Sequence, residues 1–548
     1  MPGGLLNLIA VGNQNIILNG NPTKTFFKAT YSKYTNFGLQ KFRIDFIGLR
    51  NLKMREESHF NFKIPRYGDI LLDTYVALTL PDIWSPIYNN LVSDETDSGT
   101  WAPYEFKWIK NLGTQMIKEV SITCGNTTLQ SYSGDALTVL LKRDLTETQK
   151  KKFDIMTGNI PELNDPANAF ERENQYPNAV YDNAYSPVTS EPSIRGRNIY
   201  IPLKNWFSQT SKQGLPLVAL QYNELFINIT FRPVCELCKV KTVNDTSGNI
   251  SVYQKLPDGD TYGFYRFLNS PPEHGDAPLY KLIYDDKRSD WNSDVHLIST
   301  YGFLSDHENR QFAKSAHEYL IKDIREYEFN DIYSSSKLTV PSTGLVSTWT
   351  IFLRRSDVYK RNEWSNYTNW ENDTIPSNIV SLTDKRRSTG GSMFDFSKGN
   401  LFESGEYNYK NDKNILISLG ILCDGKYKEN VFNADIYQII ENYMKSKGYC
   451  EDGIYTYNFC LDNNPENLQP SGAMNLSKFK TVELEISTLE PPDNPNFSFD
   501  IQCGENGPVS FTKTASDMYE YTYNLYIIEE RYNVLTFMSG NCGLKFAR

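Results

Sequence analysis

Short segments rich in β-branched and aromatic residues recur along the chain, and they constrain its fold more than any other feature. These windows lie at 42–46, 59–64, 74–80, 120–123, 225–231, 318–324, 347–353, 413–419, 481–486 and 521–528. Several alternate apolar with polar residues, 347–353 most regularly, as strands with one buried face do. Those of the first half are bounded by Gly, Pro, Asn or Asp, which end strands. The pattern predicts an all-β protein.

Helical and loop signals are fewer. One short helix is predicted from Ser133-Gly134-Asp135 to Leu141, with Asp135 as its N-cap. A second is predicted from 432–435 to Lys447, with Gly448 as its C-terminal stop.

Three long polar stretches, rich in turn formers, separate the strand windows. They cover residues 159–197, 241–290 and 362–412, and they show no clear periodicity. Compact domains rarely carry loops of this length without a purpose. Two strand series of similar number, interrupted by such loops, suit two tandem jelly rolls. We find no sequence repeat between the halves, so this duplication is inferred from the layout alone.

The first 23 residues contain no charged side chain, and Lys24 is the first charge. A secretion signal needs a basic region before a continuous apolar run, but no Lys or Arg precedes residues 5–11 and Asn7 interrupts them. A membrane-spanning helix needs about 20 apolar residues. N-myristoylation needs Gly after the first Met, where Pro2 stands. We therefore expect neither a signal nor a lipid anchor.

The same segment is predicted to be an extended, amide-rich arm. A turn signal at 19–22 ends it, and a strand is predicted to begin at 25–27. The alternative to such an arm is a disordered terminal tail.

Bulk charge and cysteine content narrow the class of protein. The chain has 66 acidic and 56 basic residues, a net charge of -10, so no global basic field is present to hold nucleic acid. Its 8 cysteines in 548 residues are too sparse for a disulfide scaffold. We expect free thiols in a reducing compartment, no direct nucleic-acid contact and a soluble, cytosolic chain.

No motif indicates catalysis, a cofactor or a metal. Cys235 and Cys238 form a CxxC that lacks both a second ligand pair and a thioredoxin-like context. The histidines are His59, His274, His296, His307 and His317. None has the spacing of a metal-binding motif, and no phosphate loop or GxSxG is present. We predict no catalytic, cofactor-binding or metal-ligating residue, and a protein that is not an enzyme.

Six stretches, taken in order, point beyond a fold class: 3–28, 64–71, 201–229, 304–313, 361–370 and 532–544. Together they resemble the major capsid proteins of large nucleocytoplasmic DNA viruses. LSDHENRQFA at 304–313 and RNEWSNYTNW at 361–370 are especially similar to the giant algal and protist virus branch. The similarity spans nearly the whole chain.

The resemblance implies a double jelly roll, in which two eight-stranded barrels stand side by side with long inserted loops and a few short helices. It implies a homotrimer with a pseudo-hexagonal outline that tiles an icosahedral shell over an internal membrane. The implied partners are neighbouring capsomers, minor capsid and penton proteins, inner membrane-associated viral proteins and, through outer loops, the host surface. The implied location is the virion shell, assembled in the host cytoplasm.

The resemblance also divides the chain. We expect an arm at 1–24 that acts as an inner-face tether, a first jelly roll at 25–232, a linker with inserted loops at 233–289 and a second jelly roll at 290–548.

Four residues within the resembling stretches have expected structural roles. Trp206 and Phe207 are expected to pack between the barrels. Arg66 and Asp69 are expected to form a salt bridge or a turn rather than a catalytic pair.

Two other functions fit the same strands. A scaffold or minor capsid protein could share the double barrel. A carbohydrate-binding or carbohydrate-cleaving jelly-roll protein is the other, although such proteins normally carry a secretion signal.

Overall fold

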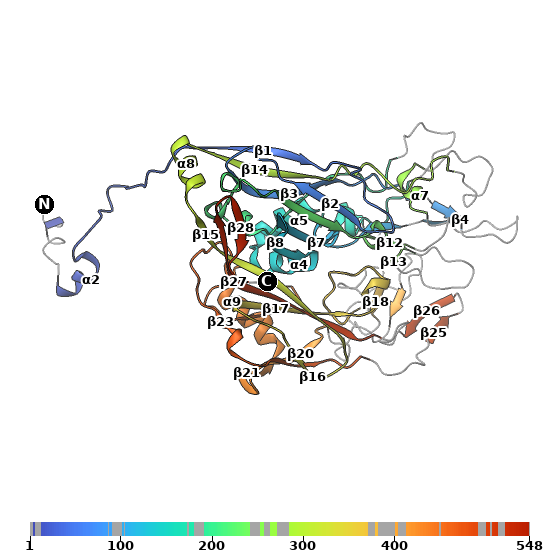
Figure 1. Ribbon diagram of the computed structural model, residues 1–548. Helices are drawn as coiled ribbons and strands as arrows, with labels where there is room; N and C mark the ends of the chain where they lie inside the picture. The colour runs from blue at the N-terminus through green and yellow to red at the C-terminus, as the bar shows by residue number, and fades with distance from the viewer. Residues whose placement is uncertain are drawn as a thin grey trace.

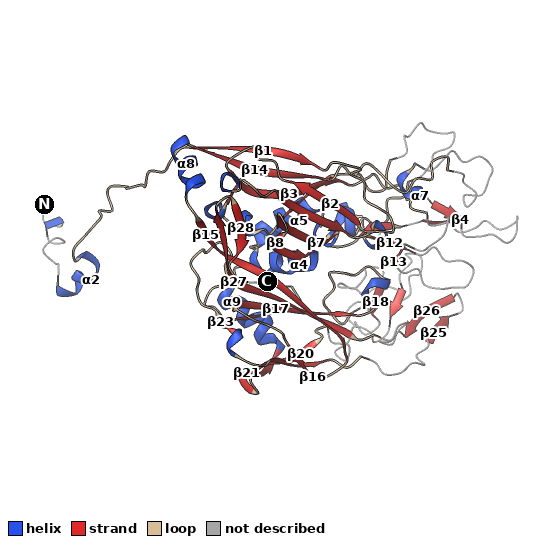
Figure 2. Ribbon diagram, viewed as in Figure 1, coloured by secondary structure: helices blue, strands red, loops and turns tan. Residues whose placement is uncertain are grey.

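The computed structural model (Figure 1) describes residues 4–5, 12–85, 87–89, 101–103, 105–172, 175–179, 191–241, 253–256, 263–270, 284–370, 379–381, 401–403, 413–448, 451–491, 500–504, 507–512 and 521–546. Strands dominate these residues, and the helices between them are short (Figure 2). Each of the ten strand windows from 42–46 to 521–528 overlaps a strand, so the all-β prediction is confirmed.

The first barrel combines sheets that share one hydrophobic core. One sheet has the order β1-β14-β3-β10, with β9 also paired to β3: β1 (Phe37–Asp45), β14 (His296–Leu304), β3 (Ile70–Thr79), β10 (Leu215–Pro216) and β9 (Asn198–Pro202). The second has the order β2 (Ser58–Lys63), β11 (Leu225–Phe231), β7 (Ile117–Cys124) and β8 (Thr127–Ser133). A smaller sheet follows the order β13 (Tyr253–Lys255), β12 (Cys238–Lys241) and β6 (Phe106–Trp108).

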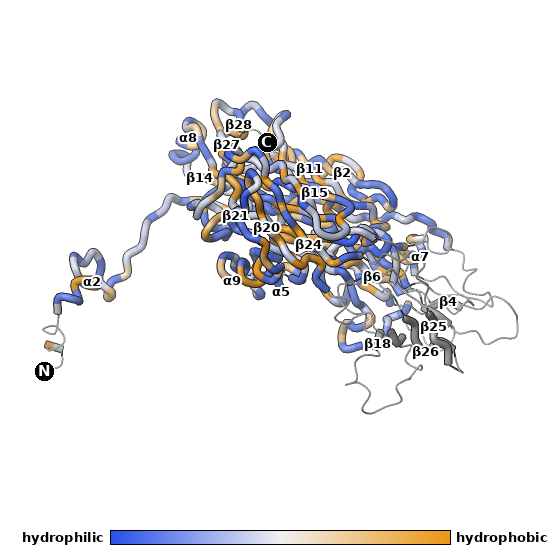
Figure 3. Tube along the Cα trace, turned by 90° about the horizontal axis from the view of Figure 1, so that it is seen from below, coloured by the Kyte–Doolittle hydropathy of each residue, from blue (hydrophilic) through white to orange (hydrophobic). Residues whose placement is uncertain are grey.

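The second barrel repeats this layout. One sheet has the order β15 (His317–Ile332), β27 (Tyr523–Met538), β17 (Leu345–Arg355) and β22 (Ile454–Asn458), with β28 (Asn541–Leu544) beside β27 and β23 (Met474–Asn475) beside β17. The other has the order β16 (Ser336–Thr339), β24 (Val482–Thr488), β20 (Leu416–Cys423) and β21 (Lys426–Asn433). Hydrophobic stretches run through the middle of the body around β20 and β24 (Figure 3).

Short strands complete the description. They are β4 (Ile87–Asn89) paired with β5 (Trp101–Pro103), and a sheet in the order β18 (Ile379–Ser381), β19 (Leu401–Glu403), β26 (Gly507–Thr512) and β25 (Asp500–Gly504).

In the sheet β15-β27-β17, the strands β17 and β27 contribute buried side chains to the cores of both barrels. Trp349 and Ile351 pack into the core of the second barrel, whereas Phe352 and Ile528 belong to the core of the first. The residues of β17 after Leu345 are all buried, so its polar positions do not face solvent as the alternation suggested. The two barrels therefore share this sheet as a common wall.

β14 corrects the expected division of the chain. The sequence assigns residues 290–548 to the second jelly roll, but β14 pairs with β1 and β3 of the first barrel. The order of the sequence does not indicate this pairing, because β14 follows the long insertion 241–290 but pairs with strands that precede it. We propose 305 as the start of the second barrel and keep the remaining boundaries as predicted.

The first predicted helix is α4 (Gly134–Asp144), which extends three residues beyond Leu141. Its N-cap is Ser133, whose hydroxyl accepts a hydrogen bond from the backbone N–H of Ala136 at 3.0 Å. The expected capping role of Asp135 is wrong, because its carboxylate instead pairs with Arg354.

The second predicted helix, unlike the first, is shorter than expected. It comprises the π-helix η12 (Ile436–Ile440) and α9 (Glu441–Lys445), and it ends before Lys447. Gly448 does not stop it. Its N–H donates to the carbonyl of Arg143 at 3.0 Å, so this glycine contacts the end of α4 in the first barrel.

The other helices of the body are α3 (Leu112–Gln115), α5 (Glu147–Thr157), α6 (Pro161–Asn164), η2 (Ala169–Glu171), η3 (Trp206–Ser208), η4 (Ser211–Gln213), η5 (Leu217–Ala219), η6 (Val234–Glu236), α7 (Tyr265–Leu268), α8 (Asp306–Lys314), η9 (Val358–Lys360) and η13 (Leu476–Lys478). α6 and η2 show that the predicted loop 159–197 is partly helical. Residues 173–174 and 180–190 of that loop, and most of 241–290 and 362–412, lie outside the described residues. In the described part of the chain, no helix has the length and apolarity required to span a bilayer.

The arm projects away from the body, as Figure 1 shows at the N-terminal end. It contains η1 (Asn13–Asn15) and α2 (Ile16–Asn19), and its described residues are exposed. The strand expected at 25–27 is absent from this described segment, and the first strand begins at Phe37. Phe26 and Phe27 are fully exposed, since no neighbouring strand is present there to pair with them.

Candidate functional site

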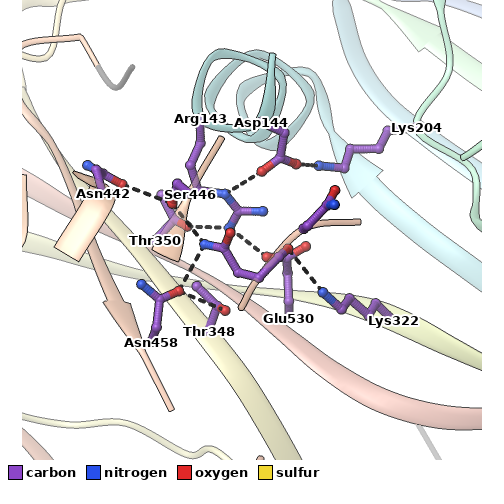
Figure 4. A network of polar contacts seen from close by, with 12 residues as sticks. Arg143, Asp144, Lys204, Lys322, Thr348, Thr350, Asn442, Ser446, Asn458 and Glu530 are labelled. Carbon is purple, nitrogen blue, oxygen red and sulfur yellow. Dashed lines mark hydrogen bonds and ion pairs between the residues drawn. The ribbon is translucent and has the colours of Figure 1, made fainter. Parts of the chain in front are cut away.

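The junction of the two barrels holds a buried network of charged side chains. Arg143, at the end of α4, has a fully buried side chain. Its Nε donates to Asp144 Oδ1 at 2.7 Å, and its Nη1 donates to Glu530 Oε2 at 2.6 Å and to Thr350 Oγ1 at 3.1 Å. Figure 4 shows Arg143 between Asp144 of its own helix and Glu530 of β27. One guanidinium thus ties the helix of the first barrel to two strands of the second.

The carboxylates of this network are held in their charged form. Burial alone would raise the pKa of Asp144, but the charges of Arg143 and Lys204, which both bond to it, lower that pKa to about 2. For Glu530, burial is likewise outweighed by Arg143 and Lys204, and its pKa is lowered. A buried ion pair adds little over an apolar contact, but removing one partner is costly. The network therefore fixes how the barrels meet.

A second ion pair crosses the junction at the start of α4. Arg354 of β17 donates to Asp135 Oδ1 at 2.6 Å, and Arg232 lies 3.5 Å from the same carboxylate. Burial would raise the pKa of Asp135, but the two arginines lower it. Glu326 of β15 accepts bonds from the Ser133 backbone N–H at 2.7 Å and hydroxyl at 2.6 Å. Both ends of α4 are thus anchored to the second barrel.

Aromatic packing closes the junction near β9 and β15. The ring centroid of Trp206 lies 5.7 Å from that of Tyr319 and 6.4 Å from that of Phe537. Both partners belong to strands of the second barrel. The prediction that Trp206 packs between the barrels is confirmed. Phe207 is buried edge-to-face against Trp206 at 5.3 Å.

The CxxC and the stretch 361–370 contact one another. Asn362 donates to the carbonyl of Cys235 at 2.9 Å and to that of Cys238 at 2.8 Å, while Trp364 Nε1 donates to the carbonyl of Glu236 at 3.0 Å. The CxxC segment is therefore a docking turn for the second barrel. Across the described residues no group of three His, Cys, Asp or Glu side chains could hold a metal ion.

Arg66 and Asp69 bond to different partners. Arg66 donates to the carbonyls of Gln221 and Asn223, at 3.3 Å and 3.0 Å. Asp69 accepts from the backbone N–H of Leu304 at 2.8 Å and from the side chain of Asn309. These residues brace a bend between the stretches 64–71, 201–229 and 304–313, which supports the turn alternative.

Asp144 gives a test of the network by pH. Its pKa is lowered from an ordinary 3.8 to about 2, so its stabilisation is complete above pH 4 and is lost as the pH falls toward 2. The shift corresponds to about 2 kcal/mol. We expect the unfolding free energy of wild type to exceed that of Asp144→Asn at pH 5, with a gap that narrows toward pH 2, measured by urea titration. Asp73→Asn, at an exposed position of β3, is the control; an equal pH effect there would contradict the assignment.

The chain matches two family models. One, described as the major capsid protein N-terminus, matches residues 25–269, and one described as the large eukaryotic DNA virus major capsid protein matches residues 308–543. Among curated relatives, the major capsid protein of Phaeocystis pouchetii virus is 24% identical over the full length of both chains. Capsid protein 1 of Acanthamoeba polyphaga mimivirus is 28% identical over 59% of this chain and 44% of that protein. The chain thus spans less than half of the latter relative.

Solved structures share the fold. The quasi-atomic model of the PBCV-1 virus capsid has a TM-score of 0.58 at 17% identity, covering 96% of this chain and 100% of that chain. The Faustovirus major capsid protein has a TM-score of 0.59 at 13% identity, covering 98% and 96%. The predicted double jelly roll is confirmed.

Proposed function

Because this chain belongs to the major capsid proteins of large eukaryotic DNA viruses, we propose that three copies form a trimeric capsomer with a pseudo-hexagonal outline. The protein is a structural subunit of the capsid shell and not an enzyme. Trimers tile an icosahedral shell above an internal membrane and are assembled in the host cytoplasm. Their partners are neighbouring capsomers and minor capsid, penton and inner membrane-associated proteins.

The observation that carries this proposal is the buried charge network at the barrel junction. A pseudo-hexagon built from three chains requires each chain to present two barrels at a fixed angle. Arg143 and Arg354 join α4 to β17 and β27, and these two strands contribute side chains to both cores. Each subunit is therefore suited to act as one rigid tile.

Exposed apolar side chains support contacts between copies. On the second barrel, the outer face of η12 and α9 exposes Ile439, Ile440, Tyr443 and Met444. On the first barrel, β1 and the turn after it expose a second group: Phe37, Leu39, Ile47 and Leu49. Contiguous exposed apolar patches mark protein interfaces, and a ring of identical subunits joins two different patches of one chain.

The helical patch offers a direct test. Tyr443 and Met444 are 85% and 67% exposed, so replacing both with serine removes apolar contact area without disturbing the core. We expect the trimer to dissociate into folded monomers, with at least a tenfold weaker association, measured by light scattering over a dilution series. Ile155→Ser, on the equally exposed α5, should leave the trimer unchanged. Stable trimers of the double variant would remove this patch from the interface.

The arm is proposed to tether the subunit on the inner face of the shell. Its uncharged, exposed residues can pair along a strand edge or contact a neighbour at low desolvation cost. We expect deletion of residues 1–23 to leave trimers intact but to reduce shell assembly strongly, measured by particle yield in electron micrographs. Normal particles from the shortened chain would rule out the tether.

A further inference from the structure

Two free thiols from different barrels meet at one end of the junction. Cys124 ends β7 in the first barrel and is 1% exposed. Cys542 lies in β28 of the second barrel, is partly exposed and packs against the core that contains Cys124. The two thiols interact: the Cys542 side chain lowers the pKa of the Cys124 thiol, and the Cys124 side chain together with burial raises the pKa of the Cys542 thiol.

A single loop holds both cysteines in place. The N–H of Gly125, next to Cys124, donates to the carbonyl of Glu224 at 3.1 Å. The N–H groups of Gln221 and Tyr222 donate to the carbonyl of Gly540 at 3.1 Å and 3.2 Å, and Asn223 bonds to Asn541 at 3.1 Å. Residues 221–224 therefore bind the segments beside both cysteines. This bracing holds the two segments that carry the cysteines beside the same loop.

We propose that Cys124 and Cys542 are an oxidation site, at which a small disulfide such as glutathione disulfide converts the two thiols into a covalent link between the barrels. A chain made in a reducing compartment carries both as thiols, and the link forms when the protein meets an oxidising environment. The link closes a loop of more than 400 residues, so it restrains the unfolded chain strongly.

The difference in exposure sets the order of the chemistry. The thiolate of the accessible Cys542 attacks glutathione disulfide and forms a mixed disulfide, releasing one glutathione thiol. The thiolate of Cys124 then attacks the Cys542 sulfur and releases the second glutathione thiol. Two cysteine thiols are oxidised and one glutathione disulfide is reduced. Once Cys542 carries glutathione it has no S–H left to donate, so the second step depends on the position of Cys124 in the core against which Cys542 packs.

The other described cysteines are less suited. Cys423 and Cys460 are buried in the second barrel. Cys238 is fully buried, so glutathione disulfide cannot reach its thiol. The backbone carbonyls of Cys235 and Cys238 are both held by Asn362. Cys235 is nevertheless the internal competitor that an experiment must separate.

The test is peptide mapping of the purified full-length chain. After incubation with glutathione disulfide and alkylation of the remaining thiols, non-reducing trypsin digestion should yield peptide 119–142 joined to peptide 532–545, each with one cysteine. The joined species should disappear on adding dithiothreitol. Alkylation of both cysteines after oxidation, or their pairing with other cysteines, would overturn the proposal.

Two variants connect the link to its effect. Oxidation should raise the thermal unfolding midpoint of wild type by several degrees, and dithiothreitol should reverse the rise. Cys542→Ser, at a partly exposed position, should abolish both the joined peptides and the shift. Cys423→Ser, which removes a cysteine of the second barrel, should retain both. A shift of wild-type size in Cys542→Ser would also overturn the proposal.

Discussion

Replacing Arg143 with alanine is expected to destabilise the folded chain by about 3–5 kcal/mol, the cost of leaving buried charges without a partner. Arg143 is fully buried and bonds to Asp144, Thr350 and Glu530. Without it, two carboxylates remain in the junction with less positive charge to balance them. Because these groups belong to both barrels, the loss should weaken the contact between them as well as α4 itself.

Urea unfolding followed by tryptophan fluorescence measures this effect. The matched control is Arg288→Ala, since Arg288 pairs with Asp286 at an exposed site and its side chain is 79% exposed. That variant should unfold near the wild-type midpoint, because exposed ion pairs contribute little. Equal midpoints for Arg143→Ala and Arg288→Ala would show that the network does not hold the junction.

Replacing Trp206 with alanine is expected to cost about 3–5 kcal/mol, the range for deleting a buried aromatic side chain. Trp206 is 1% exposed and packs against Tyr319 and Phe537 across the junction. A cavity there removes contacts of both barrels together. The free energy of unfolding should therefore fall, and the angle between the barrels should be less strictly fixed.

Trp206→Phe provides the matched control for this variant. Within the described structure the indole N–H of Trp206 is buried without a hydrogen-bond partner, so phenylalanine loses ring area but no bond. We expect its urea midpoint to lie much nearer to wild type than that of the alanine variant. If the alanine and phenylalanine variants both unfolded near the wild-type urea midpoint, the aromatic cluster would not stabilise the junction.

Local patterns predicted the strands well and their partners poorly. The window 225–231 alternates apolar and polar residues from Ile227 onward, and β11 alternates in burial along its whole length. The window 25–27 contains two phenylalanines but has no neighbouring strand, so it stays exposed. The sequence of β14 likewise predicts no partner strand. Only its pairing with β1 and β3 in the structure places it in the first barrel.

The junction was harder to predict than the fold. Arg143 and Glu530 are separated by 387 residues, and neither belongs to a motif with fixed spacing. Arg143 lies near the end of a predicted helix, and Glu530 lies beside a predicted strand. Charged residues at such places are most often exposed to solvent, so neither was predicted to be buried. Trp206 was predictable because it lies inside a stretch shared with a recognised family, whereas the partners of Asp135 required the fold.

The native mass of the purified wild-type chain, measured by light scattering during dilution, tests the central claim most directly. The account predicts a species of three times the 63.0 kDa chain mass that persists on dilution, with hexagonal outlines in negative-stain images. A folded chain that remains monomeric at every concentration, alone and with co-expressed minor capsid proteins, would contradict the trimeric capsomer.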